Sequence, residues 1–322
     1  MILKTVKTVV TALLLISSVL VAQDGIYFNA AVGDKEQAYN EMVNTKIESI
    51  GFTLSDPHER INDAYAQKYS DKVGYTEALD NLGFFSISND TALRPLLLKE
   101  PSLGAFSPFN LHMYKYKGED ITRVGHVEPS VMLDIVGVKH KSVRSDFIKM
   151  FKPLDKMIKD EIGGKKEIVS FDKLPATKLM EFELKFKRPK DLLDFVEDFQ
   201  EQFEGAFEEK KYIIAGYKNF SEVYGDMKVD FSRYDSYFVY SLCHFYFSYG
   251  IFNYGNAHAG VFAPCSMYMY IEKDSNIMHI GMPYLENWIN VAGIKDAKQI
   301  KSIRALDKEI IGIMKDLGAK LK

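Results

Sequence analysis

The sequence predicts an α+β fold made of two tandem, diverged copies of one unit, each an antiparallel sheet with helices packed on one face. The first observation is an ungapped internal repeat, in which residues 104–139 match residues 260–295 with ten identities in 36 positions. The second is that amphipathic helical stretches alternate with short strands of period two in both halves. A length of 322 residues suits two domains of about 150 residues each.

Upstream of that repeat, the match between the halves changes to an offset of 132, which pairs Thr45-Lys46-Ile47 with Thr177-Lys178-Leu179 and Pro57 with Pro189. With this offset the second copy carries about 24 extra residues. We expect them between Tyr212 and Tyr254, where the chain is rich in aromatic residues.

Each copy is expected to begin with a strand followed by a helix. In the first copy residues 45–54 are predicted to form the strand, and Asp56 is predicted to cap a helix with Pro57 at its first position and Glu59 closing a capping box. In the second copy an apolar stripe at helical spacing follows Pro189. Its members are Leu192, Phe195, Val196, Phe199 and Phe203.

The middle of each copy is expected to contain a hairpin. Residues 109–116 alternate, with His112 on the more polar face, which predicts a half-buried strand followed by a turn at 117–120. Residues 265–276 repeat the strand and the turn. The two closing helices and the linker between the copies are expected at residues 143–162, 297–317 and 163–166.

The N-terminus has the pattern of a secretory signal peptide. Lys4 and Lys7 precede an apolar run from Val9 to Ala22, which is too short to span a bilayer comfortably as a helix. We expect cleavage after Ala22, giving a signal peptide at 1–22 and two units at 23–164 and 165–322. This predicts a periplasmic or secreted protein without a stable membrane span; an uncleaved anchor is the alternative.

Charge and composition narrow the function classes. A net charge of -3 argues against nucleic-acid binding, which needs a basic surface to displace counterions from phosphates. The 47% of hydrophobic residues is typical of a folded globular chain. The sequence contains no nucleophile elbow, phosphate-binding loop, dinucleotide fingerprint or zinc-protease motif. The sequence therefore points to binding rather than catalysis.

Several turn residues resemble a known family. In the second copy these are Tyr254-Gly255-Asn256, Pro264-Cys265 and a return strand ending at Pro283, and they resemble the bacterial family called domain of unknown function 302. The first copy carries similar residues at Ser88-Asn89, Pro101, Gly104, Pro108 and Pro129.

The resemblance implies a β-α-β4-α unit like that of the TATA-binding protein, and it implies no reaction. Two departures from symmetry stand out. The first copy has Phe109 where the second has Cys265, and the second lacks a counterpart of the short helix expected at residues 96–99.

Two cysteines and several histidines are the candidates for redox or metal chemistry. Cys243 and Cys265 either form a disulfide, which an oxidising compartment favours, or remain buried free thiols. Cys265, His258 and His279 are the possible metal ligands, because thiolate and imidazole suit copper or zinc. Their spacing fits no defined metal motif, and the sequence identifies no cofactor.

The aromatic stretch 234–254 has two interpretations. It is either a strand pair buried on both faces or one wall of a groove for an apolar or ring-containing ligand. In the groove interpretation, the ligand-binding candidates of the second copy are Tyr254, Asn256, His258, Cys265, Tyr268 and His279.

In the first copy, the candidates for lining a cleft are Asn89, His112, Arg123 and His126. His126 and Glu128 are also spaced for an acid-base pair, although such a pair more often lies on the surface.

Taken together, these patterns predict an exported, non-enzymatic protein, an intrachain pseudo-dimer that binds a small apolar or aromatic ligand or a protein. The alternative is a periplasmic metal or thiol-redox protein that uses the second copy.

Overall fold

The computed structural model describes residues 22–322 as two six-stranded antiparallel sheets with helices, which confirms the predicted α+β class and two-domain layout. The expected signal peptide lies, except for Ala22, outside the described residues. No helix within residues 22–322 has the length and apolar character needed to cross a membrane.

The first unit contains six strands and five α-helices within the described residues. In chain order these are β1 (Gln23–Val32), α1 (Glu36–Glu41), β2 (Thr53–His58), α2 (Ile61–Tyr69), β3 (Leu79–Ser88), α3 (Asp90–Leu97), β4 (Phe109–Tyr116), β5 (Ile121–Val127), α4 (Pro129–Ile135), α5 (Lys141–Ile162) and β6 (Lys165–Phe171).

The second unit repeats this series. Its elements are β7 (Leu179–Lys185), α6 (Leu192–Glu209), β8 (Tyr212–Asn219), α7 (Phe220–Asp226), β9 (Tyr234–His244), α8 (Phe245–Ile251), β10 (Cys265–Glu272), β11 (Ile277–Pro283), α9 (Glu286–Val291), α10 (Ala297–Asp316) and β12 (Lys320–Leu321).

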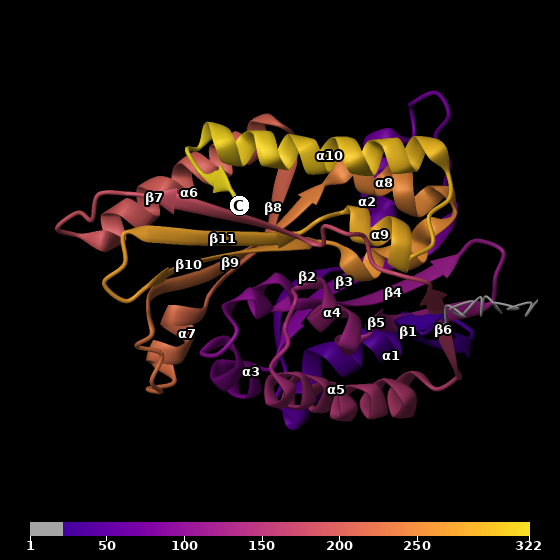
Figure 1. Cartoon of the computed structure of the whole chain (residues 1–322). Coiled ribbons are helices and arrows are strands. Elements are labelled where there is room, and N and C mark those ends of the chain that lie inside the picture. The colour runs from indigo at the N-terminus through magenta and orange to yellow at the C-terminus, as the bar shows by residue number, and fades with distance from the viewer. Residues whose placement is uncertain (1–21) are drawn as a thin grey trace, which may run out of the picture.

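Both sheets have the same strand order, which is β2-β3-β4-β5-β1-β6 in the first unit and β8-β9-β10-β11-β7-β12 in the second. Figure 1 shows α5 along one outer side of the molecule and α10 along the opposite side. The helices therefore form outer layers, and the sheets and their connecting turns lie between them.

The predicted offset of 132 upstream of the repeat is wrong. β1 and β7 begin at Gln23 and Leu179, and the helices that follow begin at Glu36 and Leu192, so both pairs have an offset of 156. The stretch taken for an insertion consists of β8, α7, β9 and α8, the counterparts of β2, α2, β3 and α3. The helix expected at 96–99 is the end of α3, and it does have a counterpart in α8.

The strand predicted at residues 45–54 is also wrong, because helical turns over Met42–Lys46 and Ile47–Ile50 continue α1. The buried residues here are Tyr39, Met42, Val43 and Ile47, at positions i, i+3, i+4 and i+8, as one helix face requires. Strand β2 follows only at Thr53.

The capping box predicted at Asp56 does not form. Asp56 and Pro57 lie in β2, and Pro57 is tolerated there because β2 is an edge strand. The helix begins instead at Ile61, after Arg60, whose φ of 47° reverses the chain direction. Tyr65 and Tyr69 form the buried aromatic side of this helix.

The hairpins and closing helices are confirmed at β4–β5, β10–β11, α5 and α10. Strand β4 differs in one respect: its first six residues are buried on both faces, not one. The aromatic stretch 234–254 also differs, because only β9 is a strand and the chain then turns into α8.

Strand β6 begins within the predicted linker, at Lys165, and pairs with β1 at the edge of the first sheet. The first sheet therefore extends past residue 164 to Phe171. In the second unit the short strand β12 holds the same position beside β7.

The two units interlock through a pair of equivalent turns. The 3₁₀ helix of the first unit, η3 (Pro101–Phe106), packs on β10, and that of the second unit, η5 (Ala257–Phe262), packs on β4. Gly104 of η3 lies against Tyr268, and Gly260 of η5 lies against His112. The contact is self-complementary, like the interface of a twofold dimer.

Hydrogen bonds cross this contact from both units. The Tyr237 hydroxyl donates to Pro101 O at 2.5 Å, and His112 Nε2 lies 2.9 Å from Ala257 O. Asn110 Nδ2 donates to Gly260 O at 2.6 Å. The close approach of the two backbones therefore allows buried polar groups of one unit to hydrogen-bond with the other unit.

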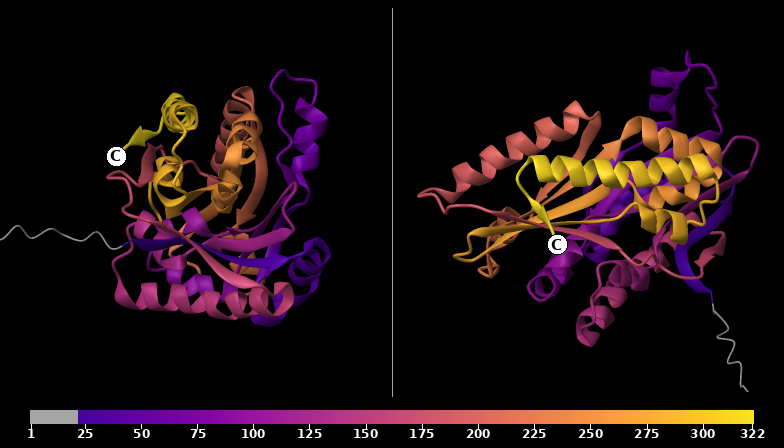
Figure 2. Two further views of the ribbon diagram at one scale, coloured as in Figure 1. Left: turned by 90° about the vertical axis from the view of Figure 1, so that its right-hand side faces the viewer. Right: turned by 45° about the horizontal axis from the view of Figure 1, so that its top comes forward.

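Each unit also extends an arm over the other. The arm formed by residues 59–78 carries α2 onto α8, where the Tyr65 hydroxyl lies 2.6 Å from Ser248 Oγ. In the opposite direction α7 reaches α3, and the Tyr224 hydroxyl donates to Asp90 O at 3.0 Å. Figure 2 shows the purple α2 arm rising beside the orange helices of the second unit.

We expect Gly260→Ala to destabilise the protein by about 1–3 kcal/mol, because a Cβ there would lie 2.5 Å from the His112 ring, in a packed interface. The measurement is the free energy of unfolding by urea. Gly205→Ala, in the exposed part of α6 with nothing near its Cβ position, is the control and should stabilise by about 0.5–1 kcal/mol. Equal effects of the two substitutions would contradict the close packing at Gly260.

Candidate functional site

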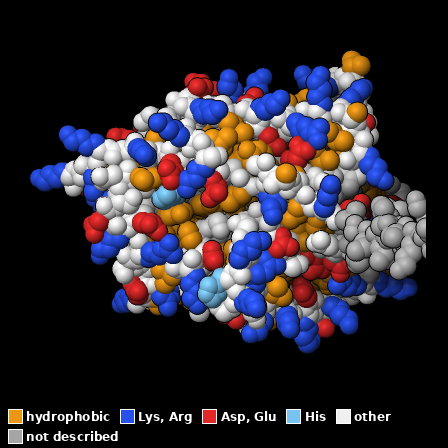
Figure 3. Space-filling view, viewed as in Figure 1, with side chains coloured by type: hydrophobic (Ala, Val, Ile, Leu, Met, Phe, Trp, Pro, Cys, Tyr) orange, Lys and Arg blue, Asp and Glu red, His pale blue; other side chains and the backbone are white. Residues whose placement is uncertain are grey.

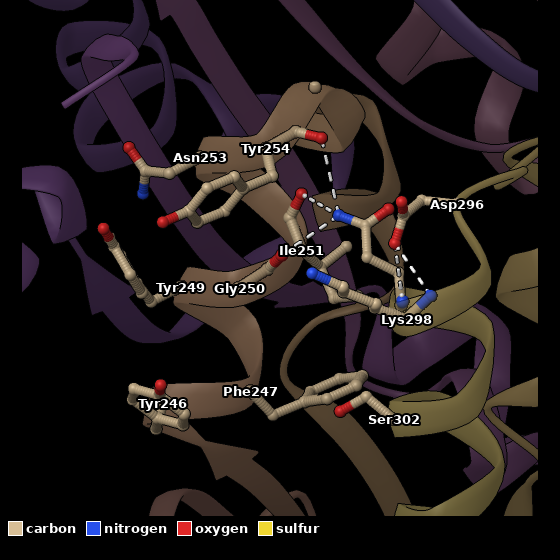
Figure 4. Close-up of a pocket in the computed structure, with 12 residues that line it drawn as sticks. Tyr246, Phe247, Tyr249, Gly250, Ile251, Asn253, Tyr254, Asp296, Lys298 and Ser302 are labelled. Atoms are coloured by element: carbon tan, nitrogen blue, oxygen red, sulfur yellow. Dashed lines mark hydrogen bonds between the residues drawn. The ribbon is translucent and has the colours of Figure 1, made fainter. Parts of the chain in front are cut away.

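An open groove with an aromatic lining lies in the second unit and has a volume of about 910 Å³. One wall is α8 and the turn after it, and the other is the first turn and a half of α10 (Figure 4). The rings that line the groove are those of Tyr246, Phe247, Tyr249 and Tyr254. Its volume is in the range typical of small-molecule sites.

Helix α8 starts where it does because His244 caps it, with Nδ1 accepting the Phe247 N–H at 3.3 Å. Asn89 caps α3 in the same way through Ala92, and each pair of counterparts differs by 155 in number. Further along the chain, the counterparts Gly104 and Gly260 differ by 156 in residue number. The second unit therefore has one extra residue after its helix.

That extra residue lies in η4 (Phe252–Asn256), a π-helical turn of a kind that recurs at functional sites. The turn breaks regular helical geometry at Tyr254, with φ and ψ of −113° and 46°, and at Gly255, with a φ of 91° that suits glycine. The bulge brings the Tyr254 ring to the rim of the groove.

Gln299 of α10 holds this turn. Its Nε2 lies within 3.0–3.4 Å of the carbonyl oxygens of Gly250, Ile251 and Tyr254, and its Oε1 accepts from Asn256 at 2.8 Å. Figure 4 draws the bonds to the three carbonyl groups, which join the two walls of the groove. The Gln299 side chain is buried, and both atoms of its amide form hydrogen bonds that hold the shape of the groove.

The arm of the first unit borders the groove on its other side. The Tyr254 hydroxyl donates to Gly74 O at 2.7 Å, and the Tyr249 hydroxyl accepts the Thr76 N–H at 2.8 Å. Burial raises the pKa of Tyr249 to about 12, so this hydroxyl stays protonated at neutral pH. The first unit therefore helps to hold two tyrosines of the lining in place, whereas the residues of the lining all belong to the second unit.

Of the residues predicted for the second copy, Tyr254 lines the groove, and Asn256 donates a hydrogen bond to Gln299 outside the lining. The other four lie elsewhere. His258 Nε2 lies 2.7 Å from Ala292 O, Tyr268 packs beneath Gly104, and His279 stacks on Tyr270 with ring centroids 4.9 Å apart.

The predicted metal ligands do not come together. Cys265 Sγ contacts Phe262 O at 3.6 Å inside the unit, while His258 and His279 face different neighbours. Within residues 22–322 no three His, Cys, Asp or Glu side chains form a group that would hold a metal ion. These three residues lie on different strands and turns, so side chains of a suitable chemical type do not form one metal site.

The four candidates of the first copy have structural contacts. Asn89 caps α3, and Arg123 pairs with Glu119 and Glu167. His112 is buried, and burial lowers its pKa to about 4 although both ring nitrogens face carbonyl oxygens. These residues do not meet in a cleft.

His126 pairs with Asp155, not with Glu128 as predicted. Its Nε2 lies 2.8 Å from Asp155 Oδ1, and its Nδ1 lies 2.8 Å from Val127 O. Burial disfavours the charged ring, but the hydrogen bond and charge of Asp155 raise the pKa of His126 above its usual value. Because both nitrogens are engaged, His126 has no free position for a substrate proton.

Sequence reasoning missed two groups of the groove. Tyr246 and Tyr249 lie in the aromatic stretch that suggested a groove, but only the helical spacing of α8 would have singled them out. Lys298 comes from the other end of the unit, and nothing in its local sequence marks it. Asn253 lies in the same aromatic stretch and was missed because it is not aromatic.

Comparisons with known proteins add little. No protein-family model matches the chain, and no curated protein matches it either. One solved structure, of an uncharacterized conserved protein of domain of unknown function 302 from Bacillus stearothermophilus, covers 42% of this chain and 95% of its own length. Its identity of 15% and TM-score of 0.34 are too low to carry an argument.

The His126–Asp155 pair predicts a pH dependence of stability. A raised folded pKa means that the pair stabilises the fold fully below pH 6.5 and loses this effect as the pH rises through the folded pKa. The destabilisation caused by Asp155→Asn should therefore be larger at pH 6 than at pH 8, measured by urea unfolding. Asp160→Asn, an exposed carboxylate on the same helix, should show no such difference; a difference of the same size there would refute the assignment.

The cysteines predict a thiol reactivity. Both are free in the structure, and burial raises the pKa of Cys243 to about 11 and that of Cys265 further. At pH 8 a disulfide-exchange reagent should react slowly with the folded protein and with two thiols per chain after unfolding in guanidinium. Absence of reactive thiols after unfolding would instead identify the disulfide.

Proposed function

We propose that this chain is an exported, non-enzymatic ligand-binding protein, made of two units that resemble the domain of unknown function 302 family. The groove between α8 and α10 is its binding site, and the ligand is a small ring-containing molecule. The two units act as an intrachain pseudo-dimer, in which one unit carries the groove and the other supplies the arm along its edge.

The observation that carries this proposal is the asymmetry between otherwise matching units. Tyr246 and Tyr249 of the second unit replace Thr91 and Arg94 of the first at equivalent positions on α8 and α3, and Tyr254 lies in the turn with the extra residue. The exposed fractions of Tyr246 and Tyr254 are 64% and 48%. Aromatic rings left exposed beside a cavity favour ligand binding, because they bury apolar surface when a ligand docks.

The polar groups of the groove support binding rather than catalysis. Asp296 caps α10, where its Oδ1 accepts the N–H groups of Lys298 and Gln299 at 3.0 and 2.9 Å. Gln299 is engaged in the turn, and the Tyr249 hydroxyl remains protonated. No base is thus held ready beside a nucleophile among the described residues of the groove.

Two further observations support export and argue against nucleic acid. Strand β1 begins at Gln23, so cleavage after Ala22 would leave the first sheet whole. On the face drawn in Figure 3, acidic side chains are interspersed among the basic ones over both halves, in keeping with the net charge of -3. A duplex would find no continuous basic surface there.

The test is a screen of small aromatic and alicyclic compounds by ligand-observed NMR, followed by titration of the hits. Ser302→Trp, on the α10 wall, should fill the groove and weaken the hits at least tenfold. Ser145→Trp, an exposed site on the matching helix α5, should leave their affinity unchanged. Hits that bind Ser302→Trp as tightly as the wild type would place the site elsewhere.

A further inference from the structure

The accessible surface of the groove is aromatic on one wall and polar on the other, and we infer that its ligand is a neutral saccharide. This inference rests on the proposed function and names the class of the ring-containing ligand. A pyranose would lie with its C–H face on the ring of Tyr246 or Tyr254. Its hydroxyl groups would hydrogen-bond with Asp296, Lys298 and Ser302. Figure 4 shows these two sets of side chains on opposite sides of the groove.

The aromatic wall offers a ligand little apolar surface apart from two tyrosine rings. Tyr246 and Tyr254 are exposed, whereas the other large apolar side chains of the lining are buried, namely Phe247, Tyr249 and Ile251. A wholly apolar ligand binds best where most of its surface is buried, and this open groove would leave its outer side in water. A pyranose needs only one apolar face covered, because the hydroxyl groups around its edge stay hydrated.

Both exposed rings are held in place without being covered. Tyr246 meets Tyr69 at 75°, with ring centroids 5.5 Å apart, and Tyr254 meets Tyr249 at 84° and 5.9 Å. A T-shaped contact uses one edge or one face of each ring, so another face stays open. The Tyr254 hydroxyl is also fixed by its hydrogen bond to Gly74 O. The negative face of a fixed ring attracts the weakly positive C–H groups of a sugar.

The polar wall carries an acceptor, a donor and a group that is both. Asp296 Oδ1 accepts from the N–H groups of its own helix, while its Oδ2 forms no hydrogen bond within residues 22–322. Lys298 is a donor without an acidic partner in the same part of the chain, and the Ser302 hydroxyl can donate or accept. Because charges of both signs line this wall, neither an anion nor a cation has a clear advantage. Sugar hydroxyls both donate and accept, so they can pair with all three groups.

The test is saturation-transfer NMR of the full chain with the methyl glycosides of glucose, galactose, mannose and N-acetylglucosamine, followed by titration of the tightest binder. At least one glycoside should bind at millimolar concentration. Its affinity should be the same at low and high salt, because the ligand is neutral. Sorbitol, which has hydroxyls but no ring, and benzyl alcohol, which has a ring but one hydroxyl, should bind at least tenfold more weakly.

Two double variants separate stacking from the contacts of the tyrosine hydroxyls. Tyr246→Ala with Tyr254→Ala removes both ring faces and should weaken the glycoside at least tenfold. Tyr246→Phe with Tyr254→Phe keeps both faces and loses the same bond to Gly74, so it should retain the affinity.

A third variant tests the polar wall. Asp296→Asn keeps an oxygen that can cap α10 but replaces the second acceptor with a donor, and it should weaken the glycoside at least threefold. Asp191→Asn, at the cap of α6 outside the groove lining, is the control and should leave the affinity unchanged.

Three results would each overturn the saccharide assignment. They are no binding of any of the four glycosides at millimolar concentration, binding of sorbitol as tightly as the best glycoside, and equal losses in the alanine and phenylalanine double variants. The groove itself is tested separately. If benzyl alcohol binds the wild type more tightly than any glycoside and Ser302→Trp abolishes that binding, the groove stands as the ligand site and the sugar does not.

Discussion

The close approach of two glycine-containing turns to the strands of the opposite unit is the constraint on which the rest of the structure depends. At Gly104 and Gly260 there is no room for a side chain, so the backbones of η3 and η5 reach β10 and β4 directly. This contact buries the outer face of β4, including His112, and sets the two sheets relative to each other. Only in that arrangement does each arm reach the helix of the other unit.

The groove is a local departure from this symmetry. One extra residue after α8 produces the π-helical turn at η4, and Gln299 secures it through three carbonyl groups. In the first unit, α3 packs on α5 without such a bulge. Symmetric contacts therefore supply the rigid frame, and a single insertion opens a site against it.

The sequence predicted the fold class, the hairpins and the closing helices because their periodicity is strong and local. It failed where a short match outweighed periodicity, as with Thr45-Lys46, which sits in a helix whose buried residues are Tyr39, Val43 and Ile47. Candidate site residues were chosen by chemical type, but type does not reveal contacts. His258 and His279 contact separate neighbours, and Lys298 joins Tyr254 only through the packing of α10 on η4.

The peptide link through Gly163 and Gly164 has a consequence for specialisation. In a homodimer of identical chains every substitution appears twice, so an extra residue that opens one groove would open a second and alter both arms. In a single chain with two units a substitution appears only once, because each unit has its own stretch of sequence. One half is then free to acquire a recognition surface while the other keeps the contacts that hold the pair together.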